Sequence, residues 1–181
     1  MKGIVFTEFI EMVENEFSIE IADQIIEASH LESEGVYTSL GTYNHEEMVQ
    51  LVQQLSVVTN MPVPDLLQVF GTYLFGCFVD GFPQFFKNIN STFVFLEHVE
   101  SYIHIEVLKL YPEAELPHFE YRYPHPNELE MTYHSVRPFA HFAKGLLQGA
   151  VTHFSEDIVI QHDDLSAGAG TSARFILTKK D

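Results

Sequence analysis

The sequence predicts an α+β fold in which a helical N-terminal half, about residues 1–112, packs on a C-terminal antiparallel sheet with one long helix, about residues 113–181. Two observations support this prediction. Apolar residues recur every three or four positions in the first half, whereas they alternate with polar residues after Pro117. The chain has 181 residues, 46% of them hydrophobic, so we expect a single domain over residues 1–181. The interface between the two parts is the expected place for a cavity.

Start signals and apolar spacing define the helices expected in the first half. They begin near Phe6, after Ser18, after Asn44, at Pro64 and at Ser91. Glu47 follows Asn44 by three positions, which is the spacing of a capping box. The helix from Pro64 is apolar on most sides and should therefore be buried. The last pattern is the longest, runs to Pro112 and contains His104.

The second half predicts two pairs of strands separated by a helix. The strands are expected over residues 118–123, 128–137, 157–162 and 172–178, and the helix over residues 138–154. Turn residues separate the members of each pair, with PHPN at 124–127 and two glycines in the loop before the last strand. The order of elements after the helical half is therefore ββαββ.

The chain is strongly acidic, which argues against several classes of partner. Its 9 Lys and Arg residues stand against 26 Asp and Glu residues, giving a formal charge of −17. Residues 1–86 contain one of the basic residues and 13 of the acidic ones, a net charge of −12. Such a surface repels phosphate backbones and anionic lipids, so we expect no nucleic-acid or membrane binding. A basic protein partner would fit, although acidic residues also simply keep a protein in solution.

Neither a membrane span nor a secretory signal is expected, and we place the protein in the cytoplasm. The apolar, uncharged stretch over residues 66–79 has 14 residues and two glycines, whereas a membrane helix needs roughly 18 apolar residues. Cys77 is the only cysteine, so it cannot form a disulfide within the chain. The sequence contains no glycine-rich phosphate loop, serine elbow or zinc-binding motif, and we expect no enzymatic activity. His118, His125 and His134 are expected at the surface.

His104 is the histidine whose surroundings suggest a cofactor. It lies among apolar residues, Ile105 and Leu108 included, and has no obvious polar partner in the sequence. Haem iron needs a single strong protein ligand because the porphyrin supplies four others, so one isolated imidazole is enough. A core histidine that is bonded to a backbone carbonyl is the alternative.

Tyr133, Ser135 and Arg137 alternate along the strand expected over residues 128–137, so they should project from the same face. The guanidinium can bind a carboxylate through two hydrogen bonds, and the two hydroxyl groups can donate to the same or a second carboxylate. Haem carries two propionates, which suit such a set. A solvated polar strand face is the alternative.

Four features together resemble the haem nitric oxide/oxygen-binding (H-NOX) domain family: the N-terminal MKGIVF, His104 in YIHIEVLKLYP, Pro117 thirteen residues later, and the triplet Tyr133-x-Ser135-x-Arg137. The resemblance spans essentially the whole chain. It implies that haem b (protohaem IX) lies between the helical half and the sheet, with His104 as the proximal ligand of the ferrous iron. The triplet would bind the propionates, and Pro117 would press on the macrocycle and distort it.

By the same resemblance, the distal side of the haem is apolar. The distal tyrosine of family members that bind dioxygen corresponds to Phe142, and the supporting polar positions correspond to Phe9 and Leu74, with Val5 and Phe78 nearby. Dioxygen on ferrous haem needs a hydrogen-bond donor, whereas nitric oxide and carbon monoxide do not. The resemblance therefore implies a sensor that binds nitric oxide and carbon monoxide and excludes dioxygen.

The resemblance also implies how a signal would arise. Nitric oxide weakens or breaks the bond from iron to His104 in this family, and the freed helix can then shift. Stand-alone bacterial members act on a histidine kinase or on a cyclic-di-GMP synthase or hydrolase, so we expect such a partner for a monomeric sensor. Some relatives carry a zinc ion near the last hairpin. Only His162 remains here, because residues 165 and 173 are Leu and Ala, and we expect no zinc.

Other functions are compatible with parts of this pattern. A haem-free interaction module would use the cavity as ordinary core, and a carrier of an apolar carboxylate would hold its ligand with Arg137. A haem enzyme is less compatible, because no distal acid or base is visible in the sequence. Bound haem would distinguish the sensor from the module and the carrier.

Overall fold

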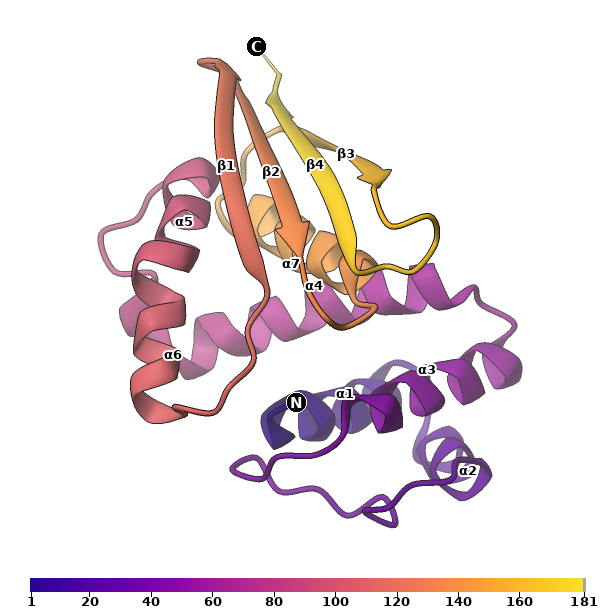
Figure 1. Ribbon diagram of the computed structural model, residues 1–181. Helices are drawn as coiled ribbons and strands as arrows, with labels where there is room; N and C mark the ends of the chain where they lie inside the picture. The colour runs from indigo at the N-terminus through magenta and orange to yellow at the C-terminus, as the bar shows by residue number, and fades with distance from the viewer. Residues whose placement is uncertain (181) are drawn as a thin grey trace.

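The structure, a computed structural model that describes residues 1–180, has the predicted α+β architecture (Figure 1). The helices of the first half are α1 (Gly3–Glu16), α2 (Ile19–Ala28), α3 (His45–Thr59), α4 (Val63–Gly81), α5 (Thr92–His98) and α6 (His104–Leu110). A short 3-10 turn covers Pro83–Phe85. The second half contains β1 (His118–His125), β2 (Glu128–His134), α7 (Ala140–His153), β3 (Ile158–Asp164) and β4 (Ser172–Lys179). The predicted elements are therefore present in the predicted order.

The strands form one antiparallel sheet in the order β1-β2-β4-β3, and α7 lies across one of its faces (Figure 1). β1 and β2 form a hairpin in which His118 lies opposite His134. β4 pairs with both β2 and β3, so that Tyr133 lies opposite Ala173. Every second residue of β2 and β4 is buried, which is the two-residue period that predicted these strands.

Helix α4 crosses the molecule between the sheet and the layer of α1 to α3, and it packs closely on α7 (Figure 1). A Cβ atom on Gly71 would meet the carbonyl oxygen of Phe142, and one on Gly145 would meet that of Gln68. Because glycine stands at both positions, the two helix backbones can approach each other. The Thr72 hydroxyl adds a hydrogen bond of 3.1 Å to the Gly145 carbonyl. Apolar clusters fill the space on both sides, one around the sheet and one among α1 to α4.

The longest predicted helix is interrupted by a π turn over Val99–Ile103, so α5 and α6 are not one regular helix. The backbone N–H of His104 donates to the carbonyl of Val99, five residues earlier rather than the usual four. The sequence could not predict this interruption, because one additional residue hardly changes an apolar pattern over so short a stretch.

Strand β2 ends at His134, whereas the sequence predicted that it would continue to Arg137. Pro138 disfavours a regular strand here because it has no N–H to donate to a neighbour. The N–H of Phe139 donates instead to the carbonyl of Arg137 at 2.9 Å, which closes a turn that leads into α7. Tyr133 is therefore the only member of the predicted triplet that lies within the strand.

Asn44 caps α3 as predicted, and its side-chain oxygen accepts a hydrogen bond of 3.1 Å from the N–H of Glu46. Glu47 does not complete the predicted capping box. Its buried carboxylate accepts hydrogen bonds from the hydroxyl of Tyr37, at 2.7 Å, and from that of Ser33. The two hydroxyl groups satisfy the carboxylate, so Glu47 ties α3 to the loop that precedes it.

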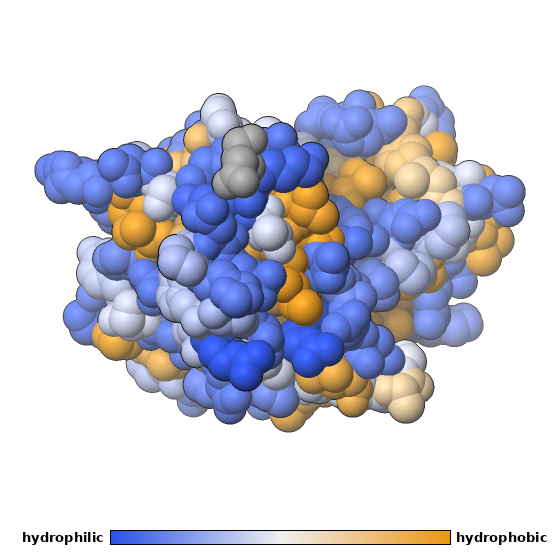
Figure 2. Space-filling model, turned by 90° about the horizontal axis from the view of Figure 1, so that it is seen from above, coloured by the Kyte–Doolittle hydropathy of each residue, from blue (hydrophilic) through white to orange (hydrophobic). Residues whose placement is uncertain are grey.

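Among residues 1–180, no single helix is both long and apolar enough to cross a membrane. Helices α3 and α4 meet those criteria only as a pair, and the pair is bent by 112°. Seen from the end of the sheet at which β4 ends, hydrophilic residues cover most of the surface, with apolar residues in a strip near its middle (Figure 2).

Candidate functional site

His104 is the first residue of α6, and 15% of its side-chain surface is exposed. Its Nδ1 lies 3.3 Å from Oε1 of Glu100, which belongs to the preceding π turn. Burial lowers the pKa of His104, and the charge of Glu100 opposes that shift only in part. The imidazole is therefore neutral near neutral pH, and a neutral imidazole is the form that binds a metal.

The apolar surroundings predicted for His104 are only partly present. Ile105 and Leu108 are 47% and 40% exposed, because α6 packs on its neighbours with a single side and contains no fully buried residue. Phe119 from β1 supplies the main aromatic contact, with its ring centroid 6.1 Å from that of His104. Glu100 was missed in the sequence, although its spacing of four from His104 on a predicted helix was a signal for this contact.

Tyr133, Ser135 and Arg137 do lie together, as predicted, although only Tyr133 is in the strand. Tyr133 is 3% exposed. Burial raises the pKa of its hydroxyl, and the hydrogen bond with Ser135 and the nearby charge of Arg137 act in the opposite direction. The Ser135 hydroxyl oxygen also accepts a hydrogen bond of 3.0 Å from the N–H of Arg137. Two hydroxyl groups and a guanidinium are thus gathered at the end of β2.

The guanidinium of Arg137 already binds a carboxylate. Its Nη2 donates to Oε2 of Glu115 at 2.5 Å, and its Nη1 donates to the backbone carbonyl of the same residue at 3.1 Å. Its Nε is buried and has no hydrogen-bond partner within residues 1–180. The Arg137 side chain is 14% exposed and that of Glu115 70%, so the carboxylate reaches the guanidinium from the solvent side. Glu115 was missed because nothing local in the sequence links it to Arg137.

One aromatic ring connects the histidine to the group of hydroxyls. The ring centroid of Phe119 lies 6.1 Å from that of His104 and 5.7 Å from that of Tyr133. Pro117 is half-buried and directly precedes β1, so it is close in sequence to Phe119. The predicted proximal residues therefore occupy one region, between α6 and the start of β1.

The predicted distal residues share a single apolar cluster among α1, α4 and α7. Phe9 and Leu74 are fully buried in it, and Val5, Phe78 and Phe142 are partly buried at its edge. The rings of Phe9 and Phe142 both contact Phe70, with centroid distances of 5.1 and 5.0 Å. That these side chains face a bound haem remains a prediction.

Near the last hairpin, His162 lies beside His141, a contact that was not predicted from the sequence. The ring of His162 lies 4.7 Å from that of His141, and Nε2 of His162 and Nδ1 of His141 are buried without hydrogen-bond partners in the described part of the chain. Within residues 1–180, no three His, Cys, Asp or Glu side chains are grouped so that they could hold a metal ion. The absence of zinc therefore stays an expectation from the sequence.

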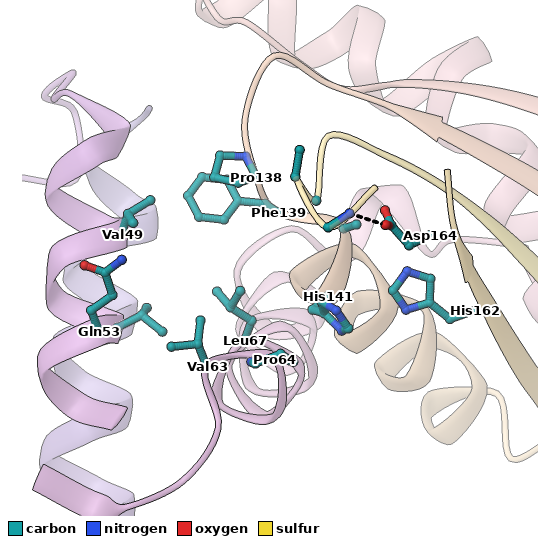
Figure 3. A pocket seen from close by; sticks show the side chains of 15 residues that line it. Val49, Gln53, Val63, Pro64, Leu67, Pro138, Phe139, His141, His162 and Asp164 are labelled. Atoms are coloured by element: carbon teal, nitrogen blue, oxygen red, sulfur yellow. Dashed lines mark hydrogen bonds between the residues drawn. The ribbon is translucent and has the colours of Figure 1, made fainter. Parts of the chain in front are cut away.

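These two histidines and Asp164 line a pocket of about 340 Å³ between α3, the start of α4 and the loop before β4 (Figure 3). Its other walls are largely apolar, with Leu67 and Phe139 among them. No residue that the sequence predicts as a haem contact lines this pocket. It is therefore distinct from the candidate haem site.

The side chains of His104, Arg137 and the apolar cluster around Phe142 have the chemistry that a haem requires. Glu100 occupies Nδ1 of His104, which leaves Nε2 as the nitrogen available to iron. Arg137 has an unpartnered buried Nε and a demonstrated carboxylate contact, which is the chemistry that a propionate requires. The apolar cluster around Phe142 suits a macrocycle that is itself largely apolar.

Comparison with known proteins agrees with this interpretation. Residues 2–162 match the family model described as haem-NO-binding. The H-NOX protein from K. algicida in the unliganded Fe(II) state is 41% identical, with a TM-score of 0.94 over 100% of this chain and 97% of that one. The H-NOX protein from S. oneidensis in the Fe(II)NO state is 28% identical, with a TM-score of 0.91 over 100% of both chains.

A third similar structure is the H-NOX from Shewanella woodyi in the Fe(II)CO state with IWP-051 bound. It is 41% identical, with a TM-score of 0.84 over 99% of this chain and 95% of that one. No curated protein sequence matches the chain significantly. The family match extends over nearly the whole chain and includes every residue of the candidate site, so the chain belongs to the haem-NO-binding (H-NOX) family of haem-based gas sensors, and its cofactor is haem.

Proposed function

We propose that the chain is a nitric oxide sensor in which His104 is the proximal ligand of haem b and Tyr133, Ser135 and Arg137 hold the propionates. The observation that supports this most is the state of His104, which is mostly buried, neutral, and held through Nδ1 by Glu100. Haem supplies the ferrous iron that binds the gas. The protein supplies one nitrogen ligand, a guanidinium for carboxylates and an apolar distal wall.

The distal wall determines which gas is retained. Phe142, Phe9 and Leu74 carry no hydrogen-bond donor in their side chains, and they lie in one apolar cluster. Dioxygen on ferrous haem needs a donor, whereas nitric oxide and carbon monoxide do not, so we propose that dioxygen is excluded. The S. oneidensis and S. woodyi proteins were characterised in their Fe(II)NO and Fe(II)CO states, which supports nitric oxide and carbon monoxide as ligands.

The signal would arise from the loss of the bond between iron and His104. Helix α6 contains no fully buried residue and follows a π turn, so few core contacts resist its movement once His104 is released. His104 thus acts as the tether that selects between two positions of α6. Pro117, beside β1, would strain the macrocycle while the tether is intact.

The shifted surface would regulate a separate signalling enzyme, a histidine kinase or a cyclic-di-GMP synthase or hydrolase. We propose a monomeric, single-domain sensor over residues 1–181 that works in the cytoplasm and is not itself an enzyme. The formal charge of −17 supports a protein partner rather than nucleic acid or an anionic membrane surface.

The decisive experiment is the anaerobic absorption spectrum of the haem-loaded ferrous protein, before and after nitric oxide and separately after air. We expect five-coordinate ferrous haem, a five-coordinate spectrum with nitric oxide, and no change in air other than oxidation. His104→Ala should lose stoichiometric haem, whereas His125→Ala, at an exposed position of β1, should keep it. Haem retained unchanged by His104→Ala, or no stoichiometric haem in the wild type, would overturn the proposal in favour of an interaction module or a carboxylate carrier.

A further inference from the structure

The Glu100 carboxylate makes three contacts that join two elements of the candidate site. Oε1 lies 3.3 Å from Nδ1 of His104 and accepts a hydrogen bond of 2.8 Å from the backbone N–H of Phe119. Oε2 lies 3.6 Å from Nδ1 of His118. Glu100 is in the π turn, whereas Phe119 and His118 are at the start of β1. One side chain therefore connects the histidine to the edge strand of the sheet.

This arrangement determines which nitrogen of His104 carries the proton. A carboxylate only accepts hydrogen bonds, so the imidazole must present an N–H at Nδ1 toward Glu100. Nε2 then has its lone pair available for a metal. A carboxylate in this position also makes the imidazole a stronger donor to the metal, as in other sites where a carboxylate orients a metal-bound histidine.

The backbone hydrogen bond from Phe119 fixes the carboxylate itself. Glu100 is 27% exposed, and without that bond its side chain would be free to turn toward solvent. The Phe119 ring also packs against both His104 and Tyr133, so the N–H and the ring of one residue hold the carboxylate and the imidazole together. Contacts from β1, as well as the contact from the turn before its own helix, therefore fix the orientation of His104.

We infer that Glu100 is the positioning residue of His104: it fixes the Nδ1–H tautomer, strengthens the bond from Nε2 to iron, and couples the position of α6 to β1. This inference rests on the proposed role of His104 as the iron ligand. Glu100 does not contact the iron and acts only through the imidazole. The negative charge of Glu100 therefore determines how strongly His104 is bonded to iron before nitric oxide binds.

Three variants separate these roles. Glu100→Gln keeps an oxygen that can accept from both His104 and Phe119 but removes the charge. Glu100→Ala removes both contacts. Glu106→Gln is the matched control, because Glu106 lies on α6 but pairs with Lys109 at 2.6 Å on the helix surface.

Two measurements are made on each variant. Nitrogen-15 NMR of the haem-free protein reports the tautomer of His104, and resonance Raman spectroscopy of the ferrous protein reports the iron–histidine stretching frequency. We expect the Nδ1–H tautomer in the wild type and a mixture in Glu100→Ala. The stretching band should move to lower frequency in Glu100→Gln and further in Glu100→Ala, with haem lost about 10- to 100-fold faster from Glu100→Ala. Glu106→Gln should match the wild type in every measurement.

An unchanged tautomer and an unchanged band in Glu100→Ala would overturn the inference. A merely structural role would leave the band of Glu100→Gln at the wild-type frequency, and that result would also contradict it. The haem-free NMR measurement does not depend on iron, so it distinguishes a failure of this inference about Glu100 from a failure of the proposed role of His104 as the iron ligand. If the tautomer responds to Glu100 but His104→Ala keeps a normal iron–histidine band, the proposed ligand is wrong while the contact of Glu100 with His104 is real.

Discussion

Arg137 binds Glu115 through both terminal nitrogens of its guanidinium: Nη2 lies 2.5 Å from the carboxylate and Nη1 lies 3.1 Å from the backbone carbonyl. The two residues lie 22 positions apart, on either side of the β1–β2 hairpin. A propionate would bind the same guanidinium. Glu115 is therefore an internal carboxylate at the position where the cofactor is proposed to place its own.

Removing this carboxylate should favour haem uptake. Glu115→Ala leaves the guanidinium of Arg137 without a competing carboxylate, so the haem-free protein should bind haem up to about fivefold more tightly. Haem titration of the haem-free protein, followed by absorption, measures this. Glu113→Ala, two residues earlier and exposed, is the control and should not change the affinity. Weaker binding by Glu115→Ala would show that the ion pair shapes the site rather than competing for it.

A donor placed in the distal cluster should allow dioxygen to bind. Phe142→Tyr adds a hydroxyl at the edge of the cluster, where Phe142 is partly buried. A hydrogen bond to a partly charged ligand contributes roughly 1.5–3 kcal/mol, so dioxygen affinity should rise about 10- to 100-fold. Spectra of the ferrous variant under increasing oxygen pressure report the affinity, with Phe142→Leu as the matched variant without a hydroxyl. An identical response of the two variants in air would contradict the placement of residue 142.

Cutting the tether should reproduce the signal without nitric oxide. His104→Gly supplied with imidazole keeps an axial nitrogen ligand but has no covalent connection between that ligand and α6. We therefore expect the backbone amides of α6 to exchange with solvent at the same raised rate in the unliganded variant and in the nitric oxide form of the wild type. Hydrogen exchange followed by mass spectrometry measures this. If α6 in the variant exchanges like the unliganded wild type, the tether does not control the helix.

The close approach of α4 and α7 should be sensitive to a single methyl group. Gly145→Ala places a Cβ atom against the carbonyl oxygen of Gln68, so the helices must separate, and we expect a loss of about 1–3 kcal/mol in the free energy of unfolding. Gly76→Ala on α4 is the matched substitution, because nothing lies within 4 Å of its Cβ position. It should stabilise the helix by up to about 1 kcal/mol. Urea unfolding of the haem-free variants measures both free energies of unfolding. Equal changes in Gly145→Ala and Gly76→Ala would show that the close approach of α4 and α7 does not account for the loss.

The pair of His141 and His162 should make the fold less stable in mild acid. Burial lowers the pKa of both below 6.5, and Lys144 lowers them further, while Asp164 opposes the shift. The unfolded chain binds these protons more readily, so stability that is present above pH 6.5 is lost as the pH falls toward the lowered pKa values. Thermal unfolding between about pH 7.5 and about pH 5 should show this loss.

The double variant His141→Gln/His162→Gln should lose less stability over the same pH range. The exposed His125 provides the control, since His125→Gln should follow the wild type. A pH dependence that persists unchanged in the double variant would assign the effect to other groups. His45 and His104, whose pKa values are also lowered by burial, would be the next to test.

The sequence predicted the order of the elements because apolar periodicity is a local signal. It also predicted that Tyr133, Ser135 and Arg137 lie together, from their alternation along the chain, and it singled out His104 from its apolar neighbours in the sequence. Glu100 could have been found from its spacing to His104 on a predicted helix.

The contacts that the sequence did not predict depend on segments that meet only after folding. Glu115 reaches Arg137 across a hairpin, and His141 meets His162 where α7 packs against β3. The end of β2 at His134 depends on how the chain turns into α7, which the alternating pattern does not contain. These contacts result from tertiary packing, and neither propensity nor spacing carries information about them.

The π turn over Val99–Ile103 has a consequence for His104, which follows it. The π turn takes up one residue more than an α-helical turn holds, and in an unbroken α-helix that residue would rotate everything after it by about 100°. If the same sequence formed one regular helix, His104 would be turned away from Phe119 and from the strand that orients it. The direction in which His104 points therefore depends on the π turn.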